Sequence, residues 1–205
     1  MNQSTDTPTA RTALRMNDQE RREHLLLYGR RYFAEFGFDA MSMQEIAKRA
    51  GVSKGLLYHH FGGRRGFYLA TVEHVIDSLL EDMQVPDGLD PVTALRTMIE
   101  RFVVFVENNA DIYQALIRGG LGADSDVVAQ LDRVRAHSIE LITAGQAELL
   151  LTPLQRVQLV GWIAWVESST SAWLDTDDIA ADTFIGVVQS TLIRAVAHLF
   201  PEPRS

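Results

Sequence analysis

Apolar residues recur every three or four positions along most of this chain, which is the spacing of a helix with one buried face. The first such stretch covers residues 17–37, where Leu26, Phe33 and Phe36 fall on a common face. No window shows the alternation of apolar and polar residues that is typical of a half-buried strand. The pattern therefore predicts an all-α fold.

Capping residues, prolines and glycines divide this pattern into separate helices. Asp90 followed by Pro91 predicts a helix start, because proline suits the first helical position. The Gly-Gly-Leu-Gly run at 119–122 follows no predicted strand and precedes no Gly-Lys-Ser/Thr, so it predicts a helix stop rather than a phosphate loop. About nine helices are predicted, over residues 17–37, 42–51, 53–61, 64–83, 90–108, 110–118, 124–150, 152–174 and 178–200.

The second and third predicted helices are short and adjacent. Ser42 is a good N-cap, and Glu45 three residues later predicts a capping box. Gly51 can end this helix in a left-handed conformation, and Ser53 caps the next one. Two short helices joined by a tight turn are typical of a helix-turn-helix.

The second helix of this pair has one face for packing and another that is free. Leu57 and Phe61 share the first face, whereas Lys54 and Tyr58 share the second. A lysine can donate to guanine acceptors in a major groove, and Gly55 permits close approach to the DNA. These residues predict DNA binding.

Residues 33–67 resemble the DNA-binding domain of the TetR (tetracycline-repressor) family of bacterial transcription regulators. The residues that match the family pattern, with its spacing intact, are Ile46-Ala47, Ala50-Gly51-Val52-Ser53, Gly55, Leu57-Tyr58, His60-Phe61 and Arg64. The resemblance implies an N-terminal three-helix helix-turn-helix domain followed by a larger helical ligand-binding and dimerisation domain. It also implies a homodimer that binds a palindromic operator in double-stranded DNA, typically as a repressor, and is released by a small, largely apolar effector.

The resemblance further implies roles for individual residues. Positions near bases are implied for Gln44, Lys54, Gly55 and Leu56, and contacts with the DNA backbone for Ser42, Ser53, Tyr58, His59 and Arg64. For His60 two roles stay open, a phosphate contact or a buried hydrogen bond. The chain departs from the family pattern at Gln44, Arg65 and Gly66, and Gly66 is expected to weaken the start of the next helix.

The charges are polarised along the chain. Residues 1–66 hold 11 Lys and Arg against 7 Asp and Glu, whereas residues 67–205 hold 8 against 20. The net charge of −8 therefore hides a basic N-terminal part and an acidic remainder. Because phosphate repels the acidic remainder, we expect one docking orientation and a strong dependence of binding on salt.

Three regions follow from these patterns. Residues 1–16 are polar and rich in Ser and Thr, and they predict a disordered arm, with a minor-groove contact through Arg11 and Arg15 as the alternative. Residues 17–63 are the predicted DNA-binding domain. Residues 64–205 are the predicted effector-binding and dimerisation domain.

The predicted helix at 152–174 is rich in tryptophan and small residues. Trp162, Trp165 and Trp173 are expected on one side, since their offsets of three and eleven nearly complete whole helical turns. Glu167 and a Ser-Ser-Thr-Ser run would be costly in lipid, so a buried bundle helix is predicted rather than a membrane span. With the helix at 178–200, it is expected to form a four-helix dimer interface through Gly161, Ala164, Ser168, Ser171, Gly186, Val187, Ser190, Ile193 and Ala197.

The acidic part is larger than DNA binding requires and is expected to enclose an effector. The candidate effector-binding residues are Phe102, Phe105, Tyr113, Trp162, Trp165 and Glu167, although any single aromatic residue among them fits a plain core position as well. Effector binding is expected to move the predicted helix at 64–83 and lower operator affinity. Control by a protein partner, without a small ligand, is the alternative.

An enzyme is the competing class, and the sequence lacks its usual signatures. There is no cysteine, which removes thiol nucleophiles and thiolate zinc sites, and neither His-Glu-x-x-His nor Gly-x-Ser-x-Gly occurs. His59 and His60 are adjacent and point apart on a helix, which argues against a shared metal. We therefore expect no catalytic residues, no metal and no cofactor, and the absence of a signal peptide or anchor predicts a cytoplasmic protein.

Overall fold

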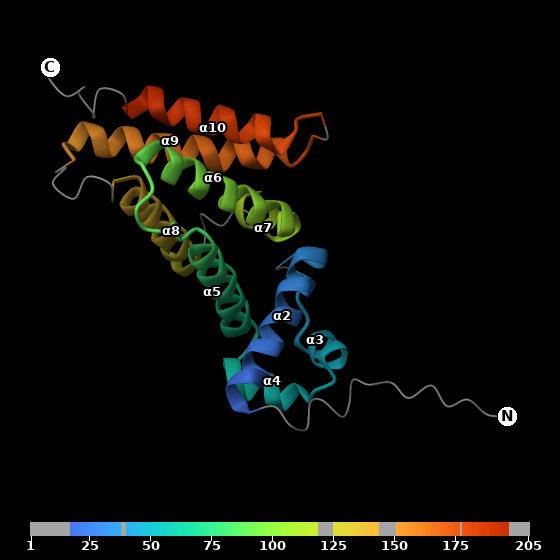
Figure 1. Ribbon diagram of the computed structural model, residues 1–205. Coiled ribbons are helices and arrows are strands. Elements are labelled where there is room, and N and C mark those ends of the chain that lie inside the picture. The colour runs from blue at the N-terminus through green and yellow to red at the C-terminus, as the bar shows by residue number, and fades with distance from the viewer. Residues whose placement is uncertain (1–16, 38–39, 119–124, 144–150, 177, 197–205) are drawn as a thin grey trace, which may run out of the picture. The chain divides into compact units, whose positions relative to one another are not determined.

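The computed structural model describes residues 17–37, 40–118, 125–143, 151–176 and 178–196 (Figure 1). Within these stretches every regular element is an α-helix, which confirms the predicted all-α fold and its nine helices. The helices are α2 (Asp18–Phe36), α3 (Met43–Ala50), α4 (Lys54–Phe61), α5 (Arg64–Asp82), α6 (Pro91–Asn108), α7 (Ala110–Arg118), α8 (Ser125–Thr143), α9 (Pro153–Trp173) and α10 (Ala181–Val196).

The chain divides into two compact units, residues 1–75 and 76–205, and α5 continues from one into the other. The predicted domain boundary at Arg64 lies at the first residue of α5, and it stays a prediction. The predicted disordered arm at 1–16 lies outside the described residues.

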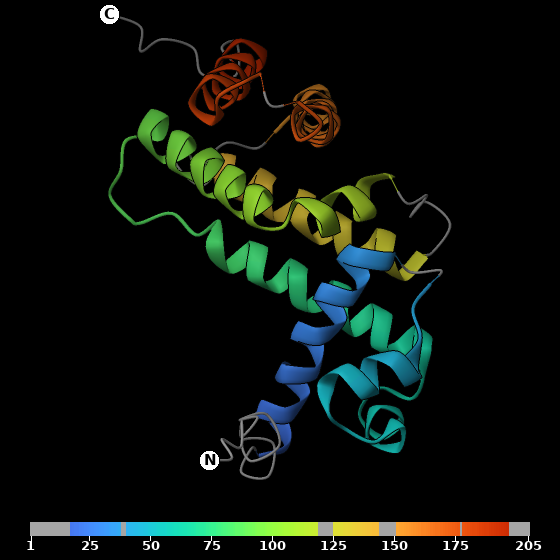
Figure 2. The same ribbon diagram turned by 90° about the vertical axis from the view of Figure 1, so that its right-hand side faces the viewer.

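The first unit is built around α2, with α3 and α4 on one side of it (Figure 2). Its core side chains are at most 2% exposed and come from all four of its helices, as Leu25, Leu26, Phe33, Ile46, Leu57 and Phe67. Phe36, expected on the same face as Leu26 and Phe33, is 40% exposed at the end of α2. Only part of the apolar face predicted for α2 is therefore buried in the core.

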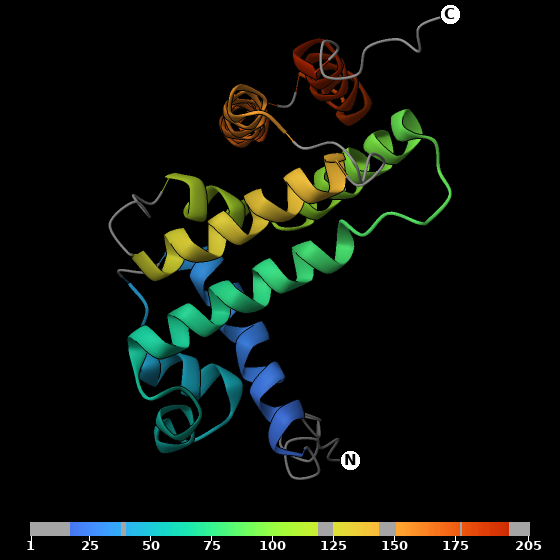
Figure 3. The ribbon, with the colours of Figure 1, turned by 90° about the vertical axis from the view of Figure 1, so that its left-hand side faces the viewer.

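The second unit packs α6, α7, α8, α9 and α10 together. Helices α9 and α10 run antiparallel side by side, and α10 also packs against α6 (Figures 1 and 2). Helix α8 lies along the C-terminal part of α5, where Arg133 donates to Asp77 at 2.9 Å (Figure 3). The bundle is therefore continuous from the end of α5 to α10.

Most helix starts agree with the capping signals. The Asn17–Glu20 pair forms a full capping box, with both hydrogen bonds at 2.9 Å. Ser42 caps α3 as expected, accepting from the Glu45 N–H at 3.3 Å, but the Glu45 carboxylate accepts from Arg49. The prediction of a full capping box, in which the Glu45 side chain would also accept from the Ser42 N–H, was therefore wrong.

The last helix starts later than the sequence suggested. The prediction placed its start at Asp178, whereas α10 begins at Ala181. The indole N–H of Trp173 donates to the Ile179 carbonyl at 2.9 Å, which holds the chain after α9 in an irregular connection. The predicted ends of α8 near Leu150 and of α10 near Phe200 lie outside the described residues.

Candidate nucleic-acid interface and effector cavity

The turn between α3 and α4 is set by glycine and serine. Gly51 has a φ of 67° and a ψ of 29°, the left-handed conformation that glycine adopts without steric cost. The next N–H, that of Val52, donates to the Ala47 carbonyl at 2.9 Å and closes the end of α3. The Ser53 hydroxyl then accepts from the Leu56 N–H at 3.2 Å and starts α4. The two helices are therefore joined by a short, fully capped turn.

Helix α4 buries one face and exposes the other, as its sequence predicts. Leu57 is fully buried and Phe61 is 8% exposed, whereas Tyr58 is 45% exposed. The Lys54 ammonium lies 5.5 Å from the centre of the Tyr58 ring, so the cation and the phenol form one exposed group. Gln44, Gly55, His59 and Arg64 are also exposed, while Ser42 and Leu56 are half-buried.

His60 differs from the other predicted DNA-contacting residues. Its side chain is only 4% exposed, and its Nε2 lies 3.7 Å from a carboxylate oxygen of Asp18 at the start of α2. Nε2 has no hydrogen-bond partner among the described residues. This burial argues against a phosphate contact for His60, and its Nε2 does not form the buried hydrogen bond that was the other expected role among the described residues.

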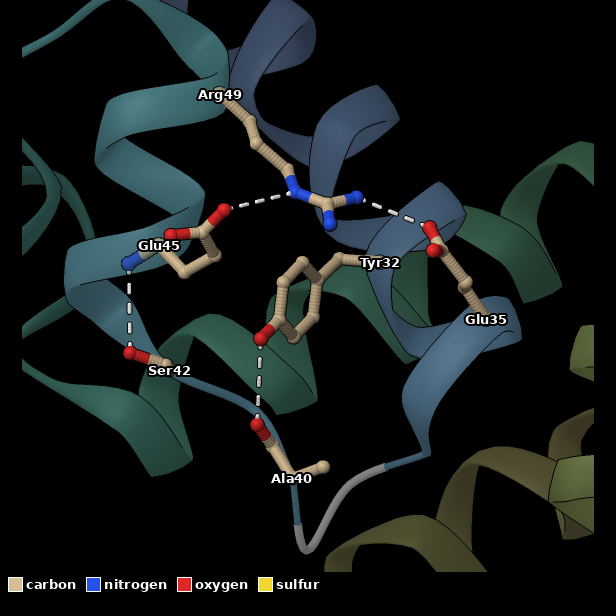
Figure 4. Close-up of polar contacts among 6 residues, drawn as sticks. All are labelled: Tyr32, Glu35, Ala40, Ser42, Glu45 and Arg49. Atoms are coloured by element: carbon tan, nitrogen blue, oxygen red, sulfur yellow. Dashed lines mark hydrogen bonds and ion pairs between the residues drawn. The ribbon is translucent and has the colours of Figure 1, made fainter.

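Arg49 holds α3 against α2 (Figure 4). Its guanidinium donates to Glu45 at 3.2 Å and to Glu35 at 3.0 Å. It also lies 5.3 Å and 5.0 Å from the ring centres of Tyr32 and Phe36. Hydrogen bonds to Glu45 and then Glu35 raise the pKa of Arg49. The i, i+4 spacing of Glu45 and Arg49 could have indicated half of this cluster.

The close approach of Phe61 to Gly66 explains one departure from the family pattern. A Cβ added at Gly66 would lie 2.0 Å from the Phe61 carbonyl oxygen, a backbone atom at the end of α4. Gly66 therefore lets α5 start directly beneath the last turn of α4. The expected weakening of α5 at this point is the cost of that close approach.

The second unit contains a partly open, apolar cavity of about 60 Å³. It is lined by Met83, Met98, Ile99, Phe102, Val134, Ser138, Trp162, Ile163, Val166, Glu167 and Val188. Three of the predicted effector residues, Phe102, Trp162 and Glu167, are thus brought together. Phe105 and Tyr113 are buried but do not line the cavity, and Trp165 is 39% exposed on the outside of α9.

Glu167, which lines the cavity, is held in an ion pair by Arg135 of α8. The Arg135 guanidinium donates from two nitrogens to the two carboxylate oxygens of Glu167, each at 2.9 Å, and also to Asp132 at 2.8 Å. The pKa of the Arg135 guanidinium is raised, mainly by its hydrogen bonds to Glu167 and to a smaller extent by that to Asp132. The Tyr113 hydroxyl donates to the Glu167 carbonyl at 3.2 Å, and burial raises its pKa. The sequence did not indicate Arg135 because its partner, Glu167, is 32 residues away and belongs to another helix.

The predicted dimer residues divide into exposed and internal positions. Gly161, Ala164 and Ser168 are exposed on α9, and Val187 and Ile193 are exposed on α10 by 45% and 42%. Gly186 and Ser190 are half-buried, and Ala197 lies outside the described residues. Ser171 is only 6% exposed and donates to Gln114 at 3.0 Å. Two faces on neighbouring helices therefore remain open for a partner, and Ser171 is not part of them.

The tryptophans of α9 do not share one environment. Trp162 and Trp173 are 8% and 7% exposed, whereas Trp165 is 39% exposed. Trp162 donates to the Thr191 hydroxyl at 3.1 Å, and Trp173 stacks on Phe184 at 4.7 Å. The expectation that all three would lie on one side was wrong for Trp165, which lies at the edge of the buried face.

In the part of the chain that the structure describes, no helix has the length and apolar character needed to cross a bilayer. Among the same residues, no three His, Asp or Glu side chains are grouped as a metal site would require.

Comparison with protein families agrees with both units. Residues 25–71 match the family model described as "Bacterial regulatory proteins, tetR family", and residues 91–196 match "Tetracyclin repressor-like, C-terminal domain". The chain belongs to the TetR family of bacterial transcription regulators. It is therefore a DNA-binding transcription regulator, and its helix-turn-helix is formed by α3 and α4.

Individual relatives of this TetR-family regulator span most of its length. The transcriptional activator FasR of Mycolicibacterium smegmatis is 30% identical over 80% of this chain and 76% of its own. The transcriptional repressor KstR of Rhodococcus jostii is 22% identical over 75% of this chain and 76% of its own. These two relatives regulate in opposite directions, one as an activator and the other as a repressor.

Solved structures show the same fold. A TetR-family regulator from Streptomyces coelicolor superposes with a TM-score of 0.82 at 25% identity, covering 92% of this chain and 85% of that one. The fatty acid degradation regulator FadR from Bacillus halodurans gives a TM-score of 0.68 at 13% identity, covering 87% of this chain and 96% of that one. The fold is therefore that of TetR-family regulators in both units.

Proposed function

We propose that this regulator binds a palindromic operator as a homodimer, represses transcription there, and is released by a small, largely apolar effector. The observation that carries the DNA-binding part is the two-faced α4, which buries Leu57 and Phe61 and exposes Lys54, Gly55 and Tyr58. A helix of this kind fits a major groove with its N-terminal residues toward the bases. Access to the bacterial chromosome requires that the protein act in the cytoplasm.

In the proposed complex, the exposed residues have two kinds of contact. Gln44, Lys54, Gly55 and Leu56 lie near base edges, whereas Ser42, Ser53, Tyr58, His59 and Arg64 contact the sugar-phosphate backbone. The N-terminus of α4, where Ser53 is the N-cap, favours phosphate and so supports the proposed backbone contact of Ser53. The acidic second unit would be repelled by the same phosphates.

Two alanine variants distinguish base contacts from phosphate contacts. Arg64→Ala should weaken binding to all sequences alike and reduce the slope of log K against log salt by about 1. Lys54→Ala should relax base preference at one position in each half-site, by about 1–3 kcal/mol. Operators selected from a random DNA pool, followed by titrations at several salt concentrations, measure both effects. Unchanged selectivity in Lys54→Ala would exclude its base contact.

Arg49 should act on DNA binding through the position of α3. Arg49→Ala removes the bond to Glu35 that ties α3 to α2, together with the bond to Glu45 within α3, so we expect severalfold weaker operator binding with an unchanged salt slope. Arg49→Lys should restore only part of the affinity, because an ammonium lacks the planar fork that contacts both carboxylates. A lower salt slope in Arg49→Ala would instead indicate a direct phosphate contact.

The homodimer is supported by the open faces of α9 and α10. Val187 and Ile193 on α10 are 45% and 42% exposed, and Gly161 and Ala164 on α9 allow close helix approach. A two-fold dimer would present two copies of α4 to successive major grooves, about 34 to 36 Å apart. Sedimentation as a monomer at micromolar concentration would refute the homodimer.

The effector is supported by the cavity, which is apolar but small. Ligand pockets usually measure about 300–1,000 Å³, whereas this cavity is about 60 Å³. Effector binding must therefore enlarge it, and flexible side chains such as Met83 and Met98 can yield most easily. Met83 follows directly on α5, so displacement there acts on the helix that leads into the DNA-binding unit. The expected result is a shift toward conformations with low operator affinity.

The competing proposal is control by a protein partner. It predicts that apolar compounds leave operator affinity unchanged, whereas the effector proposal predicts that a compound bound in the cavity lowers it. An enzyme is not favoured, because the family consists of transcription regulators.

A further inference from the structure

The cavity in the second unit has, among the described residues that line it, acceptors but no free hydrogen-bond donor. Only Ser138, Trp162 and Glu167 of this lining have side-chain nitrogen or oxygen atoms. The Ser138 hydroxyl donates to the Val134 carbonyl at 2.9 Å, and the Trp162 N–H donates to the Thr191 hydroxyl at 3.1 Å. The backbone N–H groups of the lining residues donate within their helices or, directly after α5, to the last turn of that helix. An anionic ligand would therefore meet no free donor on the described part of this lining.

The carboxylate of Glu167 is the charged group on the lining, and it shares its cation with a second carboxylate. Arg135 donates to Glu167 through two bonds of 2.9 Å and to Asp132 at 2.8 Å. Two carboxylates around one guanidinium leave one negative charge in excess. Arg135 is not among the described residues that line the cavity. A positive charge placed in the cavity beside Glu167 would therefore be attracted.

Glu167 also lines an open depression of about 420 Å³ along the C-terminal half of α9. The polar residues of this depression are Glu167, Asp175, Ser168 and Ser171, and no Arg, Lys or His is among its described lining residues. Asp175 accepts there from the side-chain amide of Gln114, a neutral donor, at 3.2 Å. The hollowed surface of α9 thus adds a second carboxylate near Glu167 and no competing cation from its described lining.

The rest of the cavity lining suits the other part of such a ligand. Phe102 and Trp162 line the cavity together with Glu167, and their rings can attract a cation through their faces. The remaining lining residues, apart from Ser138, are aliphatic or methionine and can take an apolar body. A carboxylate set among aromatic and aliphatic side chains fits an ammonium group on an apolar body.

We propose that the effector is an apolar amine, bound in its ammonium form with N–H groups that donate to Glu167. Arg135 then keeps Asp132 as its partner, so that each carboxylate has one positive charge beside it. The apolar body occupies the enlarged cavity beside Phe102 and Trp162. This inference rests on the proposed effector and adds the charge that the effector carries.

The exchange of partners also changes what holds α8. Arg135 ties α8 to α9 through Glu167, whereas Arg133 ties α8 to Asp77 of α5 at 2.9 Å. An ammonium group at Glu167 removes the first ion pair and leaves the second intact. Helix α8 can then move together with the C-terminal part of α5. The charge of the effector therefore acts on the helix whose displacement is expected to lower operator affinity.

Three compounds of one shape test the charge with the full-length wild-type protein. 4-Phenylbutylamine is positive at neutral pH, 4-phenylbutan-1-ol is neutral and 4-phenylbutyrate is negative. Isothermal titration calorimetry should show the amine binding about tenfold or more tightly than the alcohol, because its hydrogen bond to Glu167 is charge-assisted. The carboxylate should bind most weakly. The amine should also lower operator affinity.

Two glutamine variants assign the preference to one carboxylate. Glu167→Gln keeps the size of the side chain and removes its charge, so the amine and the alcohol should then bind within about threefold of each other. Glu140→Gln removes the same charge from an exposed position of α8 outside the cavity lining, and it should keep the wild-type preference. Circular dichroism checks that both variants fold, and the wild-type comparison requires no variant.

The possible results separate the charge of the effector from its existence. If the amine binds no more tightly than the alcohol, or if its preference persists in Glu167→Gln, the ammonium contact is overturned and a neutral apolar effector remains. A preferred amine that leaves operator affinity unchanged would support the cation site but overturn its role in regulation. If none of the three compounds binds, both proposals fall.

Discussion

Replacing Gly66 with alanine should destabilise the DNA-binding unit by about 2–4 kcal/mol. Operator binding should then be lost near the temperature at which the host bacterium grows. In most helices this change is favourable by about 1 kcal/mol, because alanine has the higher helix propensity. Here the new Cβ would lie 2.0 Å from the Phe61 carbonyl oxygen. That oxygen belongs to the backbone at the end of α4, so relief of the clash must displace α4 or the start of α5.

Gly55→Ala is the matched control for this prediction. Its Cβ would meet only the Ser53 hydroxyl at 3.8 Å, which is ordinary contact, and the residue is exposed on α4. The control should keep or raise the melting temperature while weakening operator binding, since the methyl group faces the proposed DNA surface. Thermal unfolding followed by circular dichroism separates the two variants. A Gly66→Ala protein that melts with the wild type would show that the junction tolerates a side chain.

Ser138→Leu should abolish the effector response while leaving operator binding intact. Ser138 lines the cavity, and its hydroxyl donates only to the Val134 carbonyl one turn earlier in α8, at 2.9 Å. Leucine removes that local bond and fills a space of about 60 Å³ with apolar atoms. The affinity for an apolar ligand should fall at least tenfold, equivalent to about 1.4 kcal/mol.

The measurement uses N-phenyl-1-naphthylamine, an uncharged apolar fluorophore. It should brighten on binding to the wild type and lower operator affinity, and both effects should be lost in Ser138→Leu. Ala129→Leu, an exposed position on the same helix, adds a leucine without touching the cavity and should behave as the wild type. If the fluorophore binds both variants equally, its site is not this cavity. If it binds the wild type without changing operator affinity, control by a protein partner becomes the better proposal.

The helix-turn-helix was predictable because its signals are local. Ser42, Gly51 and Ser53 act on backbone groups within a few residues of themselves, and their predicted caps were confirmed. The two faces of α4 follow from helical spacing alone, and Leu57 and Tyr58 lie on the expected sides. The contacts of these residues with DNA stay predictions.

Signals that depend on a second helix could not be interpreted in this way. Glu45 has the spacing of a capping box, but Arg49 competes for its carboxylate within a cluster that includes Glu35 of α2. Trp165 is at helical spacing from Trp162, yet it is 39% exposed whereas Trp162 is 8% exposed. From the sequence alone, Gly66 indicates only a weak helix start. The position of the Phe61 carbonyl oxygen shows why a side chain does not fit there.

The sequence by itself determined the all-α class, the capped turn between α3 and α4, the family of DNA-binding regulators and the polarised charge. Each of these depends on residue type and on spacing along one segment. Only the tertiary structure decided which residues enclose the cavity, that Glu167 is neutralised by Arg135, and where the surface of α9 is hollowed. These features join residues from separate helices, and helical periodicity gives the face of one helix without naming what packs against it.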